Sequence, residues 1–298
     1  MPPVSKARGQ SMERRHVDIG GGAELEAVVA GSGPVTVVFE NGLATALEQW
    51  EAVAATIAGR ARTVRYDRRR AAPSGAVPVR TAADLAEDLH RLLAALGVGP
   101  PYVLVGHSWG GAVARTFVHA HPADVVGLVL VDATHESIDS RGFALLPLMY
   151  GLMGLARRFG AGRRWLRGTL CPPGAPASYR ARLEQRMNDP AQWRISLRTA
   201  KSEGAGIRPS LAALASTCPD LPAIPVHVLT AGGVPGPNLK QIQKVHAAWK
   251  VMVERAPKAR YSNAPASGHQ MPVDVPDLVV DAITGVLDVC TPAQTCPP

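Results

Sequence analysis

The sequence predicts an α/β protein with a mostly parallel sheet and a helical segment inserted between its later strands. Three observations indicate this fold class: short apolar runs alternate with helical patterns, one run leads directly into a glycine-flanked serine and a helix, and clear strands are missing between His135 and Cys218. A length of 298 residues suits one large domain of this kind. We therefore expect a core formed by 1–135 and 221–298, with a helical cap over 136–220.

The order of elements follows from the hydrophobic periodicity. Before the cap, strands are expected at 17–19, 25–30, 35–40, 63–66, 102–106 and 125–131. Helices are expected over 82–96, which Gly97 ends, and over about 109–121, which Pro122 ends. The cap contains amphipathic stretches such as 177–187 and 191–201. After it we expect a strand over 225–229, a helix near 239–254, a strand near Arg260 and a closing helix over 276–289.

The positive charge is concentrated in the cap. The formal net charge is +8, and the segment from Gly151 to Ser210 holds twelve basic residues against three acidic ones. A field concentrated in this way attracts anions, although a solvated arginine-rich face needs no partner. With 46% hydrophobic and 19% charged residues the chain is not disordered, and no apolar run is long enough to span a bilayer. Neither a membrane nor a nucleic acid is therefore expected as a partner.

The cysteines and the first residues bear on the compartment. Cys171, Cys218, Cys290 and Cys296 form no C-x-x-C pair and have no histidine cluster beside them, so no metal is expected. Disulfides Cys171–Cys218 and Cys290–Cys296 are possible and would favour an oxidising compartment, but reduced thiols fit equally well. Residues 1–15 are polar and basic without a following apolar stretch, which predicts no signal peptide. We expect a cytoplasmic protein, with secretion left open if a leader precedes this chain.

Gly106-His107-Ser108-Trp109-Gly110 matches the pattern G-x-S-x-G, with a strand before it and a helix after it. In this setting a sharp turn holds the serine in strained backbone geometry, and the glycines allow neighbouring backbone to approach closely. The N-terminus of the following helix then faces the reacting oxygen. We therefore predict that Ser108 is a nucleophile.

These residues make the sequence resemble the α/β-hydrolase superfamily from about Val17 to Val289. The resemblance implies an oxyanion hole formed by the backbone N–H groups of Trp109 and Leu43, the latter in the loop after the third strand. The family's usual His-Gly pair is replaced here by Asn41-Gly42. We expect Asn41 either to hold this loop and contact substrate or to be an ordinary turn residue. Asp67, in a stretch that also departs from the family pattern, is expected to be structural.

The resemblance also implies the order serine, acid, histidine for a catalytic triad. His269 lies after the last strand and before the closing helix, where the family places its base, and is favoured over His135 and His246. His107 is expected to line the site rather than act as base. The family's usual acid position is vacant, because no Asp or Glu occurs between Asp220 and Glu254. Asp132, at the end of the strand over 125–131, is the expected acid, as in some dehalogenases and polyether-releasing thioesterases; Glu136 and Asp139 are rivals.

This constellation predicts a serine hydrolase that cleaves an ester or thioester of an apolar acyl group through an acyl-enzyme and needs no cofactor. A serine nucleophile disfavours epoxide hydrolase and dehalogenase chemistry, for which the family uses aspartate. Thioesterase activity on an acyl carrier protein is one alternative, and a non-hydrolytic ligand-binding or cyclising protein is another. The apolar cap residues expected to bind substrate are Met149, Met153, Trp165 and Trp193.

Overall fold

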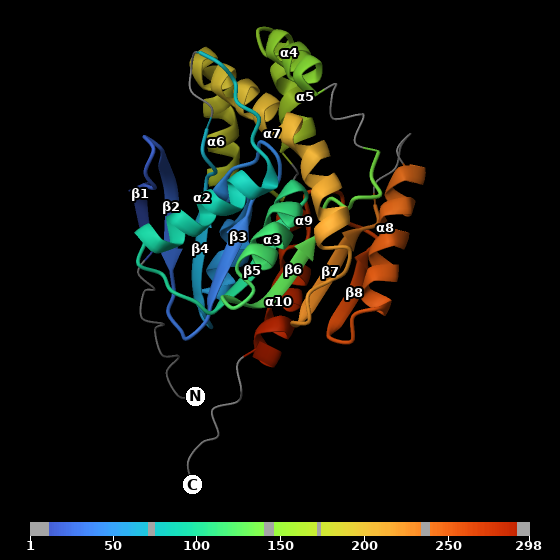
Figure 1. The fold of residues 1–298 in the computed structure, drawn as a ribbon. Helices are drawn as coiled ribbons and strands as arrows, with labels where there is room; N and C mark the ends of the chain where they lie inside the picture. The colour runs from blue at the N-terminus through green and yellow to red at the C-terminus, as the bar shows by residue number, and fades with distance from the viewer. Residues whose placement is uncertain (1–11, 71–74, 140–145, 172–173, 234–238, 291–298) are drawn as a thin grey trace, which may run out of the picture.

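The computed structural model describes residues 12–70, 75–139, 146–171, 174–233 and 239–290. Within them, eight strands form a single sheet in the order β1-β2-β4-β3-β5-β6-β7-β8. Helices cover both faces of this sheet, and the group α4, α5 and α6 lies above one end of its strands (Figure 1). This arrangement confirms the predicted α/β class with a mostly parallel sheet.

Only the first strands of the sheet are antiparallel. β1 (Glu13–Asp18) pairs with β2 (Glu24–Ala30), and β2 pairs with β4 (Arg62–Tyr66), both in antiparallel register. β4 pairs in parallel with β3 (Thr36–Glu40), and parallel pairing continues through β5 (Tyr102–His107), β6 (Val125–Val131), β7 (Val226–Ala231) and β8 (Ala259–Ala264). β1 begins earlier than expected because it is an edge strand with mostly exposed side chains, so no apolar run marks its start.

Two hydrophobic clusters fill the two faces of the sheet. One packs α2 (Ala82–Ala95), α3 (Trp109–Ala120) and α8 (Leu239–Glu254) against the strands. The other packs α1 (Glu51–Ile57) and α10 (Pro276–Cys290), with the short η1 (Leu47–Trp50) and α9 (Met271–Asp274) beside them. The pattern did not predict α1, whose inward face is only Val53, Ala54 and Ile57.

The segment between β6 and β7 contains four helices and no described strand. They are α4 (Leu146–Ala156), α5 (Gly160–Leu170), α6 (Ala177–Asn188) and α7 (Pro190–Thr217). Asp189 caps the N-terminus of α7: its side chain accepts a hydrogen bond of 2.7 Å from the Ala191 N–H, and Pro190 occupies the first helical position. The helix continues past Pro209 and is much longer than the expected stretch over 191–201.

The C-terminal half of α7 packs on the core. A Cβ atom on Gly206 would lie only 1.9 Å from the carbonyl oxygen of Arg80, so the helix can approach this backbone only with glycine there. Nearby, the Ala82 N–H donates a hydrogen bond of 2.8 Å to Ser210 Oγ. α7 is therefore part of both the cap and the core.

Ion pairs also attach the cap to the core. Arg182 on α6 pairs with Glu26 and Glu48, and Arg186 lies 3.3 Å from Asp67. Part of the basic excess is thus neutralised by core carboxylates and does not form a solvated face. Asp67 also accepts a hydrogen bond of 2.7 Å from the Leu47 N–H, which agrees with the expected structural role.

The cysteines do not form the disulfide considered between Cys171 and Cys218, because Cys218 is a free thiol. Cys290 is also free and donates to the Val126 carbonyl at 2.9 Å, while Cys296 and residues 1–11 lie outside the described residues. None of the described helices has the length and apolar character needed to cross a membrane.

Candidate active site

Ser108 occupies the sharp turn between β5 and α3, with φ 53° and ψ −122°. A Cβ atom on Gly106 would lie 2.6 Å from the Gly110 carbonyl oxygen, and one on Gly110 would lie 2.4 Å from that of Asn41. Both glycines of the G-x-S-x-G motif are therefore required by close backbone approach. The turn places the serine side chain at the N-terminus of α3, beside the loop that follows β3.

The described non-glycine residues with positive φ, a strained backbone conformation, all lie at this site. Besides Ser108, only Ala44 and Asp132 among the described non-glycine residues have positive φ, at 57° and 41°. Such conformations are costly and persist where surrounding structure holds them. All three residues follow a parallel strand at the same edge of the sheet, which is where ligands bind in open α/β folds.

The structure brings the three predicted triad residues together. His269 Nε2 lies 3.0 Å from Ser108 Oγ, and its Nδ1 lies 2.6 Å from Asp132 Oδ2. Asp132, the acid expected from the sequence, thus lies within hydrogen-bond distance of this imidazole. The rival Glu136 instead forms an ion pair of 2.7 Å with Arg115. An imidazole between a hydroxyl and a carboxylate is the geometry that proton transfer from the serine requires.

Asp132 is kept ionised by its neighbours. Burial raises its pKa, but the imidazoles of His246 and His269 and the Ala231 N–H, which donates to Oδ1 at 3.1 Å, hold the pKa well below the ordinary range. His246 Nε2 lies 3.9 Å from the same Oδ1. Sequence reasoning treated His246 only as a rival base; the structure places it as a second imidazole beside the carboxylate, supplied by α8.

The prediction that His107 binds substrate is wrong, because its side chain is completely buried. Its Nε2–H donates a hydrogen bond of 2.8 Å to the carbonyl oxygen of His269, and its ring packs against Trp50 and the His269 ring. It therefore holds the loop that carries the base. Burial, together with the nearby His269, lowers the pKa of His107 to about 3, so the ring stays neutral.

We predict an acid-dependent loss of stability that originates at His107. In the unfolded chain this imidazole takes up a proton below about pH 6.5, but in the folded chain only near pH 3, so the stability falls as the pH drops between these values. The slope is about 1.4 kcal/mol per pH unit. His107→Gln, which cannot titrate, should lose this slope in urea unfolding measured across the window. His135, whose burial lowers its pKa to about 4, contributes a separate slope that the variant should keep.

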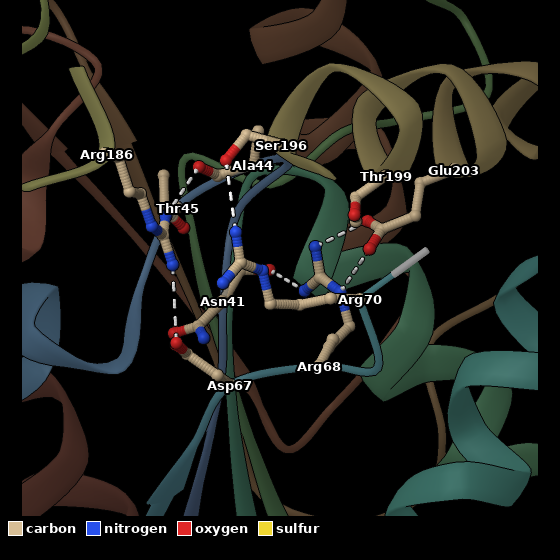
Figure 2. A pocket seen from close by; sticks show the side chains of 10 residues that line it. All are labelled: Asn41, Ala44, Thr45, Asp67, Arg68, Arg70, Arg186, Ser196, Thr199 and Glu203. Carbon is tan, nitrogen blue, oxygen red and sulfur yellow. Dashed lines mark hydrogen bonds and ion pairs between the residues drawn. The ribbon is translucent and has the colours of Figure 1, made fainter. Parts of the chain in front are cut away.

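Asn41 holds the loop after β3 and also lines a small pocket with Arg68 and Glu203 (Figure 2). Its contact with substrate stays a prediction. Its Nδ2 donates a hydrogen bond of 2.6 Å to the Tyr66 carbonyl, and its Oδ1 accepts one of 2.9 Å from Gln49. A Cβ atom on the next residue, Gly42, would lie 2.9 Å from His107 Nδ1 and 3.5 Å from Ser108 Cβ. The loop therefore passes directly beside the serine, and Leu43 follows at this point.

Arg68 is a functional candidate that sequence reasoning missed. Its guanidinium is buried between two carboxylates, at 2.6 Å from Glu40 and 2.7 Å from Glu203, and these pairs raise its pKa despite the burial. It also donates hydrogen bonds to the carbonyl oxygens of Asn41 and Gly42, the latter at 2.8 Å. Figure 2 shows Arg68 between the loop and Glu203, which comes from α7. Glu203 lies 135 positions away along the chain, and no local pattern marks the pair.

A cavity of about 230 Å³ opens beside Ser108 and His269. Its walls are the segment after β6 and the helix α8, and they include Ile138, Ile242 and Val245 with the polar Gln241 and His246. The cap residues expected to bind substrate do not line it. Met153 and Trp193 are buried against Met187, while Met149 and Trp165 are exposed. Periodicity alone does not show whether an apolar cap residue packs within the cap or faces outward, so the part of these four residues in substrate binding stays a prediction.

Comparison with known proteins agrees with this architecture. A family model of the α/β-hydrolase fold matches residues 35–160. The uncharacterized protein YqjL of Bacillus subtilis (strain 168) is 37% identical over 118 residues, which are 39% of this chain and 46% of that protein. An AB hydrolase superfamily protein of Gibberella zeae is 32% identical over 127 residues, 41% of this chain and 39% of its own. The matches thus span less than half of each relative.

Solved structures match over almost the whole chain. The epoxide hydrolase CorEH has a TM-score of 0.68 at 18% identity, covering 95% of this chain and all of its own (100%). A thermophilic esterase from Thermogutta terrifontis has a TM-score of 0.61 at 22% identity, covering 93% and 99%. At such identities the likeness shows the fold alone. Together with the sheet order and the Ser108 turn, these matches show that the chain has the α/β-hydrolase fold.

Proposed function

We propose that the protein is a serine hydrolase that cleaves a carboxylic ester or thioester of an apolar acyl group through an acyl-enzyme. The single observation that carries this proposal is the His269 imidazole, within hydrogen-bond distance of both Ser108 Oγ and Asp132. The similarity to an epoxide hydrolase concerns the fold, since Ser108 stands where that chemistry would need aspartate. The apolar wall of the cavity supports an apolar acyl group.

In the proposed reaction, His269 Nε2 takes the proton of Ser108 as Oγ attacks the carbonyl carbon. Asp132 accepts a hydrogen bond from Nδ1–H, which fixes the tautomer and stabilises the imidazolium. The imidazolium then protonates the leaving alcohol or thiol as the acyl-enzyme forms. Water, deprotonated by the same imidazole, attacks the acyl-enzyme and releases the acid and the free serine.

The Leu43 and Trp109 N–H groups are the proposed oxyanion hole. Trp109 begins α3, where the first N–H groups have no acceptor within the helix. The Leu43 N–H belongs to the trans peptide whose carbonyl is Gly42, and in a trans peptide the C=O and N–H point in opposite directions. Because Arg68 binds the Gly42 carbonyl, the Leu43 N–H is directed away from Arg68. Arg68 is thus a positioning residue for the oxyanion hole.

We predict that Arg68→Lys lowers kcat by about 10- to 100-fold with little change in KM, because a lysine cannot hold both carbonyls while pairing with two carboxylates. Glu203→Gln, which retains the shape of the pair, should lower kcat less. Both variants should also weaken binding of a boronic acid that mimics the tetrahedral intermediate. Steady-state kinetics and inhibitor titration measure these effects.

Arg115→Lys is the matched control for that prediction. Arg115 is also a buried arginine paired with a carboxylate, so its replacement should cost similar stability. Its kcat should stay close to that of the wild type. An equal loss of kcat in Arg115→Lys, or a change in KM alone in Arg68→Lys, would show that Arg68 has only a structural role.

A panel of p-nitrophenyl esters and acyl thioesters of increasing chain length tests the proposed reaction. Hydrolysis that rises with chain length up to the size of the cavity is expected. The basic cap favours one second candidate, a thioesterase that acts on an acyl carrier protein. It would show a kcat/KM for carrier-bound substrate that falls steeply with added salt. Absence of hydrolysis together with absence of fluorophosphonate labelling would indicate a binding protein instead.

A further inference from the structure

Large apolar side chains are exposed along one side of α4 and at the start of α5. Leu148, Leu152, Leu155 and Phe159 are 62%, 61%, 54% and 63% exposed. Their spacing of four, three and four residues places the three leucines on one side of α4. The other side of α4 packs against α7: Met153 contacts Trp193, and a Cβ atom on Gly154 would lie 2.6 Å from the Trp193 ring nitrogen. We call this exposed set, with the exposed Trp165, the outer cap face.

The charge around the outer cap face is mainly positive, and Glu184 on α6, which pairs with Arg167, is a carboxylate beside it. Between Asp139 and Glu184 the sequence contains no acidic residue. Arg158, Arg163 and Arg164 are exposed, and no described carboxylate pairs with them. By contrast, Arg182 and Arg186 further along the cap are paired with core acids. Part of the unpaired positive charge of the cap therefore lies beside its exposed apolar side chains.

We propose that the outer cap face binds the surface of an anionic lipid bilayer. A helix with leucine, phenylalanine and tryptophan on one side and arginine beside them lies in the interface of such a membrane, with its apolar side among the acyl chains and its arginines at the phosphate groups. α4 and α5 lie at the top of Figure 1, above the sheet, where the core does not cover them. The proposal concerns peripheral binding and departs from the expectation that a membrane is not a partner.

Charge and shape favour lipid over protein partners. Two copies of this chain would bring the same unpaired arginines together, and the repulsion would oppose a symmetric dimer. An acidic protein would match the arginines but not a row of exposed leucines, whereas a bilayer matches both at once. The proposal does not depend on the proposed hydrolase reaction, because no residue of the outer cap face contacts the triad in the described structure.

Vesicle flotation tests the proposal. The full chain should bind vesicles of phosphatidylcholine mixed with phosphatidylglycerol, and should bind phosphatidylcholine vesicles at least about tenfold more weakly. Added salt should reduce the binding to the mixed vesicles. The double variant Leu152→Asp/Phe159→Asp and the triple variant Arg158→Glu/Arg163→Glu/Arg164→Glu should each lose at least about tenfold of this binding.

The matched controls are Val251→Asp, an exposed apolar residue on α8 at 51% exposure, and Arg91→Glu on α2. Both should bind vesicles like the wild type. Fluorophosphonate labelling and circular dichroism should be unchanged in all variants, which separates loss of binding from loss of folding. The proposal is wrong if the wild type floats with neither vesicle or if the controls lose binding equally. It is also wrong if light scattering shows a dimer that Leu152→Asp/Phe159→Asp dissociates, or if only an acidic carrier protein binds this face.

Discussion

Ser108→Ala is expected to abolish covalent labelling by a fluorophosphonate and to lower turnover by about 10⁴-fold or more. The reagent forms its bond to the serine oxygen that the turn between β5 and α3 presents to His269 Nε2 at 3.0 Å. Without that oxygen no acyl-enzyme can form, and only the residual effect of the oxyanion hole and of substrate binding remains. Alanine has the same backbone requirements as serine, so the folded structure should be retained.

Ser216→Ala is the control for this experiment, since Ser216 is an exposed serine in the last turn of α7. It should be labelled like the wild type. Peptide mapping of the labelled wild type should identify Ser108 alone. Labelling that persists in Ser108→Ala would mean that another group is the nucleophile, and the assignment of the site would fail with it.

Asp132→Asn is expected to lower kcat by about 10³- to 10⁴-fold while the protein stays folded. The carboxylate accepts a hydrogen bond from His269 Nδ1–H, which leaves Nε2 free to accept the serine proton. An amide can donate its N–H to Nδ1 instead, and the ring then carries its proton on the wrong nitrogen. The loss should be largest in kcat, because the interaction strengthens as the imidazolium forms.

Two further variants define the role of Asp132. Glu136→Gln removes the sequence rival, which is engaged with Arg115, and should leave kcat within a few-fold of the wild type. His246→Gln removes the second imidazole and should change kcat far less than Asp132→Asn does. If Glu136→Gln instead causes the large loss while Asp132→Asn does not, the acid lies on the other residue.

The candidate triad could be predicted from the sequence because its three residues follow a known order along the chain and lie at the ends of strands. Ser108 was marked by its motif, His269 by its place before the closing helix, and Asp132 by the absence of any acid after β7. Each inference used one strand end, and parallel strands bring their carboxyl ends to the same edge of the sheet. Distance along the chain therefore did not obscure the site.

Other features depend on which side of a helix faces inward, and the sequence does not determine this. Met153 and Trp193 turned into the cap, Trp165 turned outward, and the cavity wall came from α8 instead. Arg68 and Glu203 are ordinary charged residues until the fold buries both together. The amphipathic stretch expected over 191–201 is part of a helix that continues through Gly204, Gly206 and Pro209 to Thr217, where it packs against α2 and α3.

The position of Asp132 after β6 leaves β7 without a reacting side chain. The end of β7 contributes only backbone groups: the Ala231 N–H binds Asp132, and the Gly233 N–H binds the Ser267 carbonyl at 2.9 Å. The segment that follows leads to α8, whose Gln241, Ile242 and Val245 form a wall of the cavity. The apolar wall of the cavity thus comes from another stretch of chain than Ser108, Asp132 and His269, although His246 of α8 also lies beside Asp132. Under the proposed reaction, substitutions of Ile242 and Val245 would reshape the cavity wall without altering the contacts among Ser108, His269 and Asp132.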